Sequence, residues 1–428
     1  MRARERMLGA ALVGATVLGV AVADVRIGPR AIQAQRAASA DELAARAPED
    51  EAAREALRAR GAAGLRALLA AHAPDVARLR AGDGEGLEAL RAAIDAVSGQ
   101  RDGHASGLFW HTDLDAARRE AARRGVPILS LRLLGRLDEE LSCANSRYFR
   151  IVLYADPEVA RAMSREFVLH WSSERPAPVI TIDMGDGRTL RRTITGNSVH
   201  YVLDADGRPL DAIVGLYGPQ GFRAALDDAR EVHRRCTAAS DRAACLAEAH
   251  REQRREARAR WARSIDGPSF DAARRPIRPS APGPAPAAAI AMPLTIRKAF
   301  VETPALEAMG APAPPRPPEP DWASFGVALH GLAELSDSSR ALLRLKTGRT
   351  DVRAIARRLA EDARADGVRN EVHFRDVVRQ WFEARDASTR ALDALNRRVY
   401  AELLLTPASD PWLGLRSDDL YDGIEVED

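Results

Sequence analysis

The sequence predicts an α/β protein in which one mixed sheet is covered by helices, with a helical module before it and an all-helical region after it. Three observations lead to this class. Residues 24–107 carry leucines at helical spacing, residues 108–230 alternate helices with short apolar runs, and helical periodicity returns from residue 321 after a proline-rich stretch. At 428 residues, the chain is long enough for two or three domains.

The first 23 residues have the layout of a secretory signal peptide. Three arginines stand within residues 2–6, an apolar run extends from Met7 to about Val20, and Ala21-Val22-Ala23 precedes Asp24. The run is shorter than the ~20 residues of a spanning helix, which disfavours the alternative of an uncleaved membrane anchor. We therefore expect cleavage of residues 1–23 and an exported protein, periplasmic or secreted, with no membrane span after cleavage. Disulfides persist in such compartments.

Charge and composition argue against a nucleic-acid partner. The 63 basic and 61 acidic residues give a formal net charge of +2, far from the positive excess of a polyanion-binding protein. Nearly all of the positive charge is arginine, since lysine occurs only at positions 298 and 346. Aromatic residues make up 5% of the chain, which disfavours a base-stacking platform.

Residues 24–107 read as a small amphipathic helical module. Ser39 and Glu42 have the spacing of a capping box, so a helix is expected to begin there. The segments "AAGLRALLAAHAPDVARLRAG" and "EGLEALRAAIDAVSG" place leucines at helical spacing, and each ends at a glycine that can terminate a helix. Nothing in this module suggests catalysis.

Helix and strand signals alternate within residues 108–230. Asp113 is a candidate N-cap for a helix that stops at Gly125, and the apolar run 126–134 predicts a buried strand. Asp156 predicts another helix start, and "FVLHW" a second strand. The segments "VITIDMGDGRTLRRTIT" and "VHYVLDADGRPLDAIVGL" predict hairpins that turn at their glycine-containing centres, before "GPQGFRAALDDAREVHRR" returns to helix.

This part of the chain resembles the thioredoxin-like superfamily. The resemblance rests on "GVPILSL", "CANS", "DPEVA" and "REFV", which follow one another with the spacing of one branch of that family. The segment "GNSVHYVLDADGRP" continues the match in register from Gly196 to Gly207. About a quarter of the chain is covered, from Trp110 to Leu226. The resemblance implies a thioredoxin-like mixed sheet covered by helices.

Two departures from the family pattern fall at its sites of chemistry. The resemblance gives Cys143 the position of the attacking cysteine, but Ser146 stands where the resolving cysteine would be. Ser198 stands where the family has its cis-proline. The additional segment "LLGRLDEELS" separates the strand from Cys143. A helix N-terminus favours a thiolate, so Cys143 could form a mixed disulfide with a thiol client, but Ser146 could not resolve it.

Two functions remain open from these residues. The first is monothiol (C-x-x-S) thiol–disulfide exchange or thiol capture through Cys143. The alternative is a redox-inactive scaffold whose helical flanks bind a protein partner and in which Cys143 is a small buried side chain. The run Asp138–Glu140 favours the alternative, because negative charge near a thiol disfavours the thiolate.

The helical extension 231–266 contains the other two cysteines, Cys236 and Cys245. On one straight helix they would lie ~13 Å apart, too far for a disulfide. If the chain turns back near Ser240-Asp241, with Ser240 capping a second helix, the cysteines can face each other. We expect a structural disulfide, with a redox-active pair that serves Cys143 as the competing interpretation.

The remaining features do not predict a cofactor or a metal. No metal-binding histidine or cysteine spacing occurs, and His170 and His200 fall on predicted strands, where a hydrogen-bonded core histidine is the simpler interpretation. Trp110, Trp171 and Trp412 are expected to anchor packing. Residues 267–320 are rich in proline and are expected to be an extended linker, and residues 321–428 form a helical C-terminal region with an acidic tail.

Overall fold

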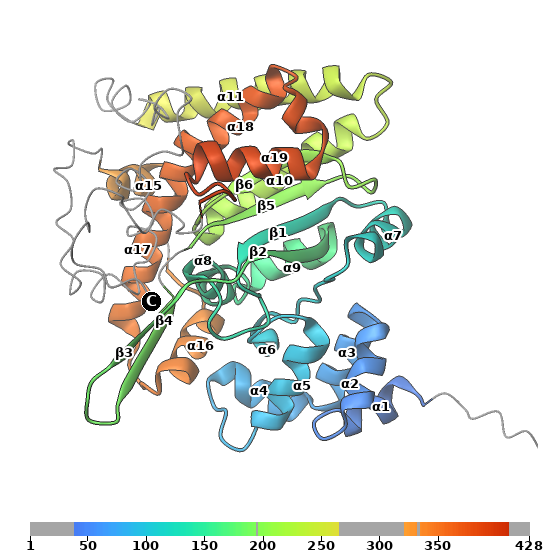
Figure 1. Ribbon diagram of the computed structural model, residues 1–428, viewed down its shortest axis with the longest axis vertical. Helices are drawn as coiled ribbons and strands as arrows, with labels where there is room; N and C mark the ends of the chain where they lie inside the picture. The colour runs from blue at the N-terminus through green and yellow to red at the C-terminus, as the bar shows by residue number, and fades with distance from the viewer. Residues whose placement is uncertain (1–37, 194–195, 265–320, 332–333, 411–428) are drawn as a thin grey trace, which may run out of the picture. The chain divides into compact units, whose positions relative to one another are not determined.

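The computed structural model describes residues 38–193, 196–264, 321–331 and 334–410 (Figure 1). The predicted signal peptide, the proline-rich linker, Trp412 and the acidic tail lie outside these residues. The described residues from Ser39 onward belong to one compact unit.

The first helices are short and amphipathic, as predicted. The capping box is confirmed: Ser39 Oγ accepts the N–H of Glu42 at 3.1 Å, and the Glu42 carboxylate accepts the N–H of Ser39 at 2.7 Å. Buried leucines, among them Leu57 and Leu68, hold the helices together. The helices are α1 (Ala40–Arg46), α2 (Glu51–Ala59), α3 (Ala62–Ala71), α4 (Ala73–Ala81), α5 (Glu88–Ser98) and α6 (Gly103–Ser106).

A mixed four-stranded sheet confirms the predicted α/β class. Its strands are β1 (Ile128–Leu134), β2 (Val168–Arg175), β5 (Ser198–Leu203) and β6 (Pro209–Val214), in the order β2-β1-β5-β6. Strand β1 is parallel to β2 and antiparallel to β5, which is antiparallel to β6. The parallel pair needs a long crossover, which is made by α8 (Ala144–Tyr148), the π-helix η1 (Phe149–Leu153) and α9 (Pro157–Glu166).

Both faces of the sheet are covered, and β5 shows this residue by residue. His200 contacts the rings of Phe149 in η1 and Phe222 in α10. Its neighbour Tyr201 points to the opposite face and donates a hydrogen bond to Asn396 Oδ1 at 3.0 Å. Because side chains alternate along a strand, one face of β5 packs on the crossover and α10, and the other packs on the C-terminal helices.

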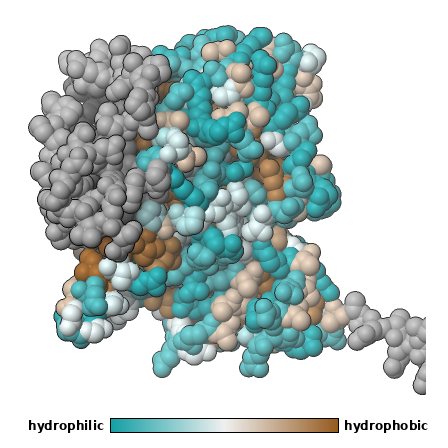
Figure 2. Space-filling model, viewed as in Figure 1, coloured by the Kyte–Doolittle hydropathy of each residue, from teal (hydrophilic) through white to brown (hydrophobic). Residues whose placement is uncertain are grey.

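A second, two-stranded sheet is formed by β3 (Val179–Asp183) and β4 (Thr189–Thr193). Both predicted hairpins, β3–β4 and β5–β6, are therefore confirmed. The β3–β4 hairpin carries two exposed large apolar residues, Val179 and Met184, which are the most exposed of their kind in the described part of the chain. Elsewhere the described surface on the face drawn in Figure 2 is largely hydrophilic, with apolar patches confined to small areas.

Three longer helices frame the sheet: α7 (Leu114–Arg124), α10 (Pro219–Cys236) and α11 (Arg242–Ser264). Asp113 caps α7, as predicted, by accepting the N–H of Ala116 at 2.6 Å. Gly125 ends this helix with a φ of +67°, a left-handed conformation that glycine adopts without steric cost. The chain can therefore reverse directly into β1.

The C-terminal helices pack against the sheet and against α10 and α11. Arg375 links the C-terminal helices to the sheet and to α10. Its guanidinium donates to Asp211 Oδ2 in β6 at 2.7 Å and to the Ala225 carbonyl in α10 at 3.1 Å. The elements are α15 (Trp322–His330), α16 (Asp337–Thr347), α17 (Arg353–Asn370), η2 (Glu371–Arg375), α18 (Asp376–Glu383), η3 (Ala387–Arg390), α19 (Leu392–Arg398) and η4 (Val399–Leu403).

Candidate functional site around Cys143

Cys143 lies at the start of the crossover that follows β1. Its backbone N–H donates to the Leu134 carbonyl at 3.2 Å, which ties the loop after the strand to the strand end. As the N-cap of α8, its Sγ accepts the backbone N–H of Ser146 at 3.4 Å. The predicted helix start at this cysteine is therefore present, but the thiol is free and has no exposed surface.

Ser146 is also fully buried and uses its hydroxyl within the same turn. Its Oγ lies 2.6 Å from Ser142 Oγ and 2.9 Å from the Cys143 carbonyl oxygen. The serine therefore stabilises the first turn of α8. A hydroxyl cannot displace a thiol from a mixed disulfide, so this pair has no dithiol chemistry.

The segment that precedes Ser198 lies against this helix start. Thr193 Oγ1 donates to the Ser142 carbonyl at 3.0 Å, and a Cβ placed on Gly196 would come within 2.6 Å of Asn145 Oδ1. Ser198 itself is the first residue of β5, fully buried, and its Oγ has no hydrogen-bond partner among the described residues. The structure thus brings together the two stretches that carry the three predicted site residues.

Residues of the C-terminal region contact Asn197, which lies next to Ser198 at the start of β5. Tyr400 donates a hydrogen bond from its hydroxyl to the Asn197 carbonyl at 3.4 Å, and Asn197 Nδ2 donates to Thr406 Oγ1 at 2.7 Å. Burial raises the pKa of Tyr400 well above its usual value, and the nearby Cys143 adds to this rise. The phenol is therefore neutral and close to the thiol. We define Asn197, Tyr400 and Thr406 as the cover of the site.

His200, which is linked to the surroundings of the thiol through Tyr154, is a poor base. Tyr154, whose pKa is raised by burial and by the proximity of Cys143, holds its hydroxyl 2.7 Å from His200 Nε2. Burial lowers the pKa of His200 to about 3, so the ring is neutral at physiological pH. Within the described part of the chain, the contact with the Ser146 N–H is the only hydrogen bond of Cys143 Sγ. No side chain of a base or cation is therefore hydrogen-bonded to the thiol within the described residues, in contrast to the usual activation of a catalytic thiol.

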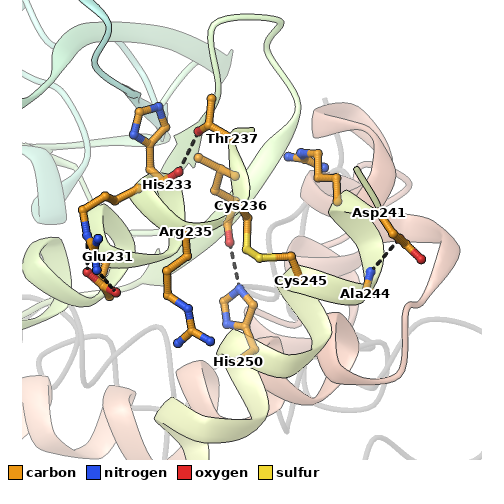
Figure 3. Close-up of a disulfide and its surroundings, with 12 residues drawn as sticks. Glu231, His233, Arg235, Cys236, Thr237, Asp241, Ala244, Cys245 and His250 are labelled. Carbon is orange, nitrogen blue, oxygen red and sulfur yellow. Dashed lines mark hydrogen bonds and ion pairs between the residues drawn. A yellow bond between two sulfur atoms is a disulfide. The ribbon is translucent and has the colours of Figure 1, made fainter. Parts of the chain in front are cut away.

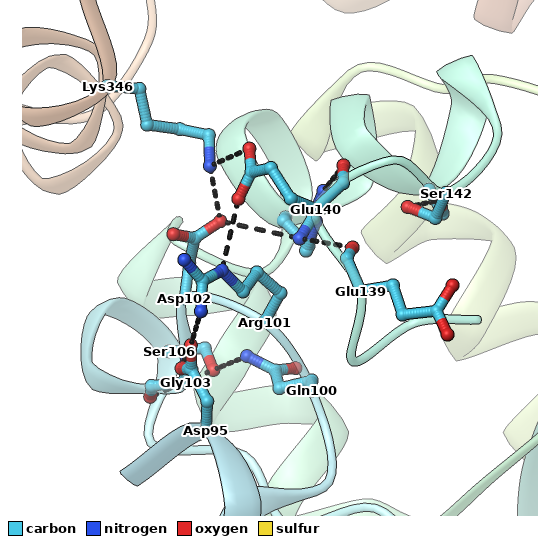
Figure 4. A network of polar contacts seen from close by, with 12 residues as sticks. Asp95, Gln100, Arg101, Asp102, Gly103, Ser106, Glu139, Glu140, Ser142 and Lys346 are labelled. Carbon is cyan, nitrogen blue, oxygen red and sulfur yellow. Dashed lines mark hydrogen bonds and ion pairs between the residues drawn. The ribbon is translucent and has the colours of Figure 1, made fainter. Parts of the chain in front are cut away.

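The acidic run before Cys143 is paired with cations. Glu140 forms ion pairs with Lys346 at 2.9 Å and with Arg101 at 3.0 Å (Figure 4). Asp138 lies 2.7 Å from Arg136, which also lies 3.4 Å from Glu139. The negative charge that the sequence places near the thiol is therefore largely compensated.

Asp102 is the centre of the network in Figure 4, which joins the first helices to the Cys143 loop and to α16. Lys346 Nζ lies 2.9 Å from its carboxylate, and Arg150, which is as fully buried, lies at 3.6 Å. Burial alone would raise the pKa of Asp102, but the charges of Lys346 and Arg150 outweigh it and hold the pKa below its usual value. One of the two lysines of the chain thus fixes α16 to the loop that carries Cys143.

Cys236 and Cys245 form the predicted disulfide. Cys236 ends α10, Cys245 lies in the first turns of α11, and their Cα atoms are 5.6 Å apart across the turn between the helices (Figure 3). The predicted cap is one residue off: Asp241, not Ser240, accepts the N–H of Ala244 at 2.9 Å. Serine and aspartate are comparably good N-cap residues, so residue type does not decide between them; the geometry of the turn places Asp241 at the helix start.

The histidines and tryptophans of the central region serve the core. His170 Nδ1 lies 2.8 Å from Ser130 Oγ, and burial lowers the pKa of His170 to about 4. Trp110 and Trp171 are buried, as expected of packing anchors, and both donate their indole N–H to a polar partner. Among the described residues, no group of three or more potential metal ligands comes together.

Comparison of the chain with protein-family models, curated proteins and solved structures gives no match. None of the helices in the described ranges combines the length and the apolar character that crossing a bilayer requires.

Sequence reasoning missed the cover of the site. Tyr400 and Thr406 lie more than 200 positions from Asn197 along the chain. Tyr400 is an ordinary residue of a helical, apolar segment and Thr406 follows that segment, and no local pattern marks either of them. Only the packing of the C-terminal region on the sheet brings these residues to Cys143.

Proposed function

We propose that this chain is an exported, redox-inactive scaffold with a thioredoxin-like central domain, whose helical flanks bind a protein partner. The observation that carries the proposal is the complete burial of Cys143. A thiol must reach a substrate disulfide in line with its sulfur–sulfur bond, and a thiol without exposed surface cannot do so.

The order of elements supports the thioredoxin-like part of the proposal. The resemblance implies a strand, a helix that begins at the cysteine, a second strand and then a hairpin followed by a helix. The chain has β1, α8 with Cys143 at its N-cap, β2, the β5–β6 hairpin and α10 in that order. Ser198 begins β5, and the residues just before it lie against the first turn of α8.

Export is supported by the cysteine chemistry. The Cys236–Cys245 disulfide is compatible with an oxidising compartment, where such bonds persist. Cys143 is buried in the hydrophobic core together with Phe149 and Tyr154. Burial would protect this single thiol from unwanted pairing during and after export.

Monothiol exchange is the second candidate, and one contact favours it. The Ser146 N–H points at Cys143 Sγ from 3.4 Å, an arrangement that stabilises a thiolate at a helix N-terminus. This function requires the cover to open. It differs from the scaffold in that Cys143 would be chemically indispensable.

Two variants separate the candidates. Cys143→Ala should leave the set of disulfide-linked complexes of the exported protein unchanged on non-reducing gels, because none involves Cys143. Ser146→Cys should not create insulin-reducing activity, because position 146 is as buried as the thiol. Mixed disulfides that disappear in Cys143→Ala, or a reductase gained by Ser146→Cys, would instead establish the monothiol function.

A further inference from the structure

A cavity of about 550 Å³ lies between α16 and α17, and its lining includes neither Cys143 nor the cover. Cavities of this size commonly hold small organic ligands. Leu335 and Ala356 supply buried apolar lining, and arginines supply most of the polar lining. The combination of apolar wall and guanidinium groups suggests a ligand that is itself part apolar and part anionic.

One face of α17 provides most of the charged lining. Arg353, Arg357, Glu361 and Arg364 follow one another at spacings of three or four residues, which places them along the same side of the helix. Arg353 already forms an ion pair with Asp351, whose carboxylate lies 2.7 Å from its guanidinium.

Arg364 differs from the other buried arginines of the described chain. It is 6% exposed, yet it makes no hydrogen bond or ion pair with any described residue. Its Nε is buried without a partner, as are the Nε atoms of Arg150, Arg375 and Arg379. Arg150, Arg375 and Arg379 are at least as buried, and each has a carboxylate at 3.6, 2.7 and 2.8 Å, respectively. A buried guanidinium without a counter-ion is unfavourable, so its retention in a cavity points to a ligand.

The packing around Arg364 fixes the stem of the side chain. A Cβ on Gly326 of α15 would come within 2.7 Å of Arg364 Cγ, so the glycine leaves the room that this stem occupies. The pKa of His330, at the end of α15, is lowered mainly by burial. The charge of Arg260 lowers it further, and so does the charge of Arg364. Arg364 therefore stands beside the cavity with its stem fixed and without an ion-pair partner among the described residues.

We propose that this cavity binds an organic carboxylate with an apolar body. Arg364 would hold the carboxylate through its planar pair of N–H donors, with Arg357 as a second cation. Leu335 and Ala356 would contact the apolar body. Glu334 and Glu361 also line the cavity and repel a multiply charged anion, so a monocarboxylate is preferred over a phosphate.

Titration calorimetry of the full-length protein with sodium octanoate tests the proposal, with 1-octanol and inorganic phosphate as comparison probes. We expect saturable binding of octanoate and at least tenfold weaker binding of both other probes. Arg364→Gln should weaken octanoate binding at least tenfold. The matched control is Arg358→Gln, on the same helix but outside the cavity, and it should bind like the wild type.

A thermal-melting series keeps the test decisive if a variant folds poorly. Without ligand, Arg364→Met should melt no lower than the wild type, because it removes an unpaired buried cation, and octanoate should no longer raise its melting temperature. Arg357→Gln, at an exposed position, should weaken octanoate binding several-fold. Octanol that binds as well as octanoate, or octanoate affinity unchanged in both Arg364→Gln and Arg357→Gln, would overturn the proposal.

Discussion

The buried pair Asp211–Arg375 offers the sharpest test of how the C-terminal helices are held to the sheet. Both side chains are almost completely buried, and Nη2 of Arg375 lies 2.7 Å from the carboxylate. We consider two single variants, Arg375→Met and Asp211→Asn. Arg375→Met leaves a buried carboxylate that has lost its closest cation, and removing one partner of such a pair costs about 3–5 kcal/mol.

Asp211→Asn should cost less, because Arg375 keeps other partners. Glu371 and Asp228 lie 3.4 and 3.7 Å from its guanidinium, and the Ala225 carbonyl accepts from it at 3.1 Å. The asparagine can still accept a hydrogen bond, so we expect a loss of about 1–2 kcal/mol. The double variant should lose less than the sum of the two single variants, since no charge remains unpaired at position 211.

Urea unfolding followed by near-ultraviolet circular dichroism measures these differences, and pH adds a second check. Burial would raise the pKa of Asp211, but Arg375 and the charges around it hold the pKa below 3.8. The stability contributed by this carboxylate is therefore present above pH 3.8 and is lost as the pH falls through the lower folded value. In Arg375→Met burial is no longer opposed by Arg375 and should raise the pKa of Asp211 relative to the wild type, so the defect should shrink as the pH falls through that higher value. Equal losses for the two single variants, or a loss below 1 kcal/mol for Arg375→Met, would refute the reasoning.

Three further predictions concern other parts of the chain. Burial raises the pKa of Asp95 from 3.8 to about 6, so the wild type loses stability as the pH rises from 4 to 6 and Asp95 ionises. Chemical unfolding should therefore show Asp95→Asn gaining up to about 3 kcal/mol relative to the wild type over this range. A pH-independent difference would contradict this. Replacing Cys236 and Cys245 by alanine should cost about 2.5–3 kcal/mol by urea unfolding, from a loop closed over a separation of 9 residues, and an unchanged midpoint would contradict it. Tyr400→Ala should raise the alkylation rate of Cys143 at least tenfold without unfolding the protein, as judged by circular dichroism; an unchanged rate would show that Tyr400 does not shield the thiol.

Local signals in the sequence predicted the elements well. Asp113 and Asp156 cap helices because a short carboxylate reaches the free N–H groups of the first turn, and this depends only on neighbouring residues. The hairpins follow from alternation about glycine turns for the same reason. The predicted N-cap of α11 was wrong by one residue. Ser240 and Asp241 can both cap a helix, and only the turn geometry selects Asp241.

Long-range packing explains what the sequence could not predict. Tyr400 lies close to Cys143 and bonds Asn197, but sequence reasoning assigned it to a separate helical region of unknown role. The sequence also does not show that Arg364 lacks an ion-pair partner, because the pattern of an amphipathic helix is the same whether or not a carboxylate from another element faces the arginine. Such properties depend on which elements meet, and the order of residues within one element does not specify this.

The reactivity of Cys143 in the native protein tests the central claim most directly. The rate of alkylation by iodoacetamide should be measured by intact mass, in buffer and in denaturant, at several values of pH. If Cys143 is a structural thiol beneath a closed cover, the native rate should lie roughly a hundredfold or more below the denatured rate, because only local opening exposes the sulfur. A native rate equal to that of the denatured chain at neutral pH would contradict the account and identify Cys143 as a working thiol.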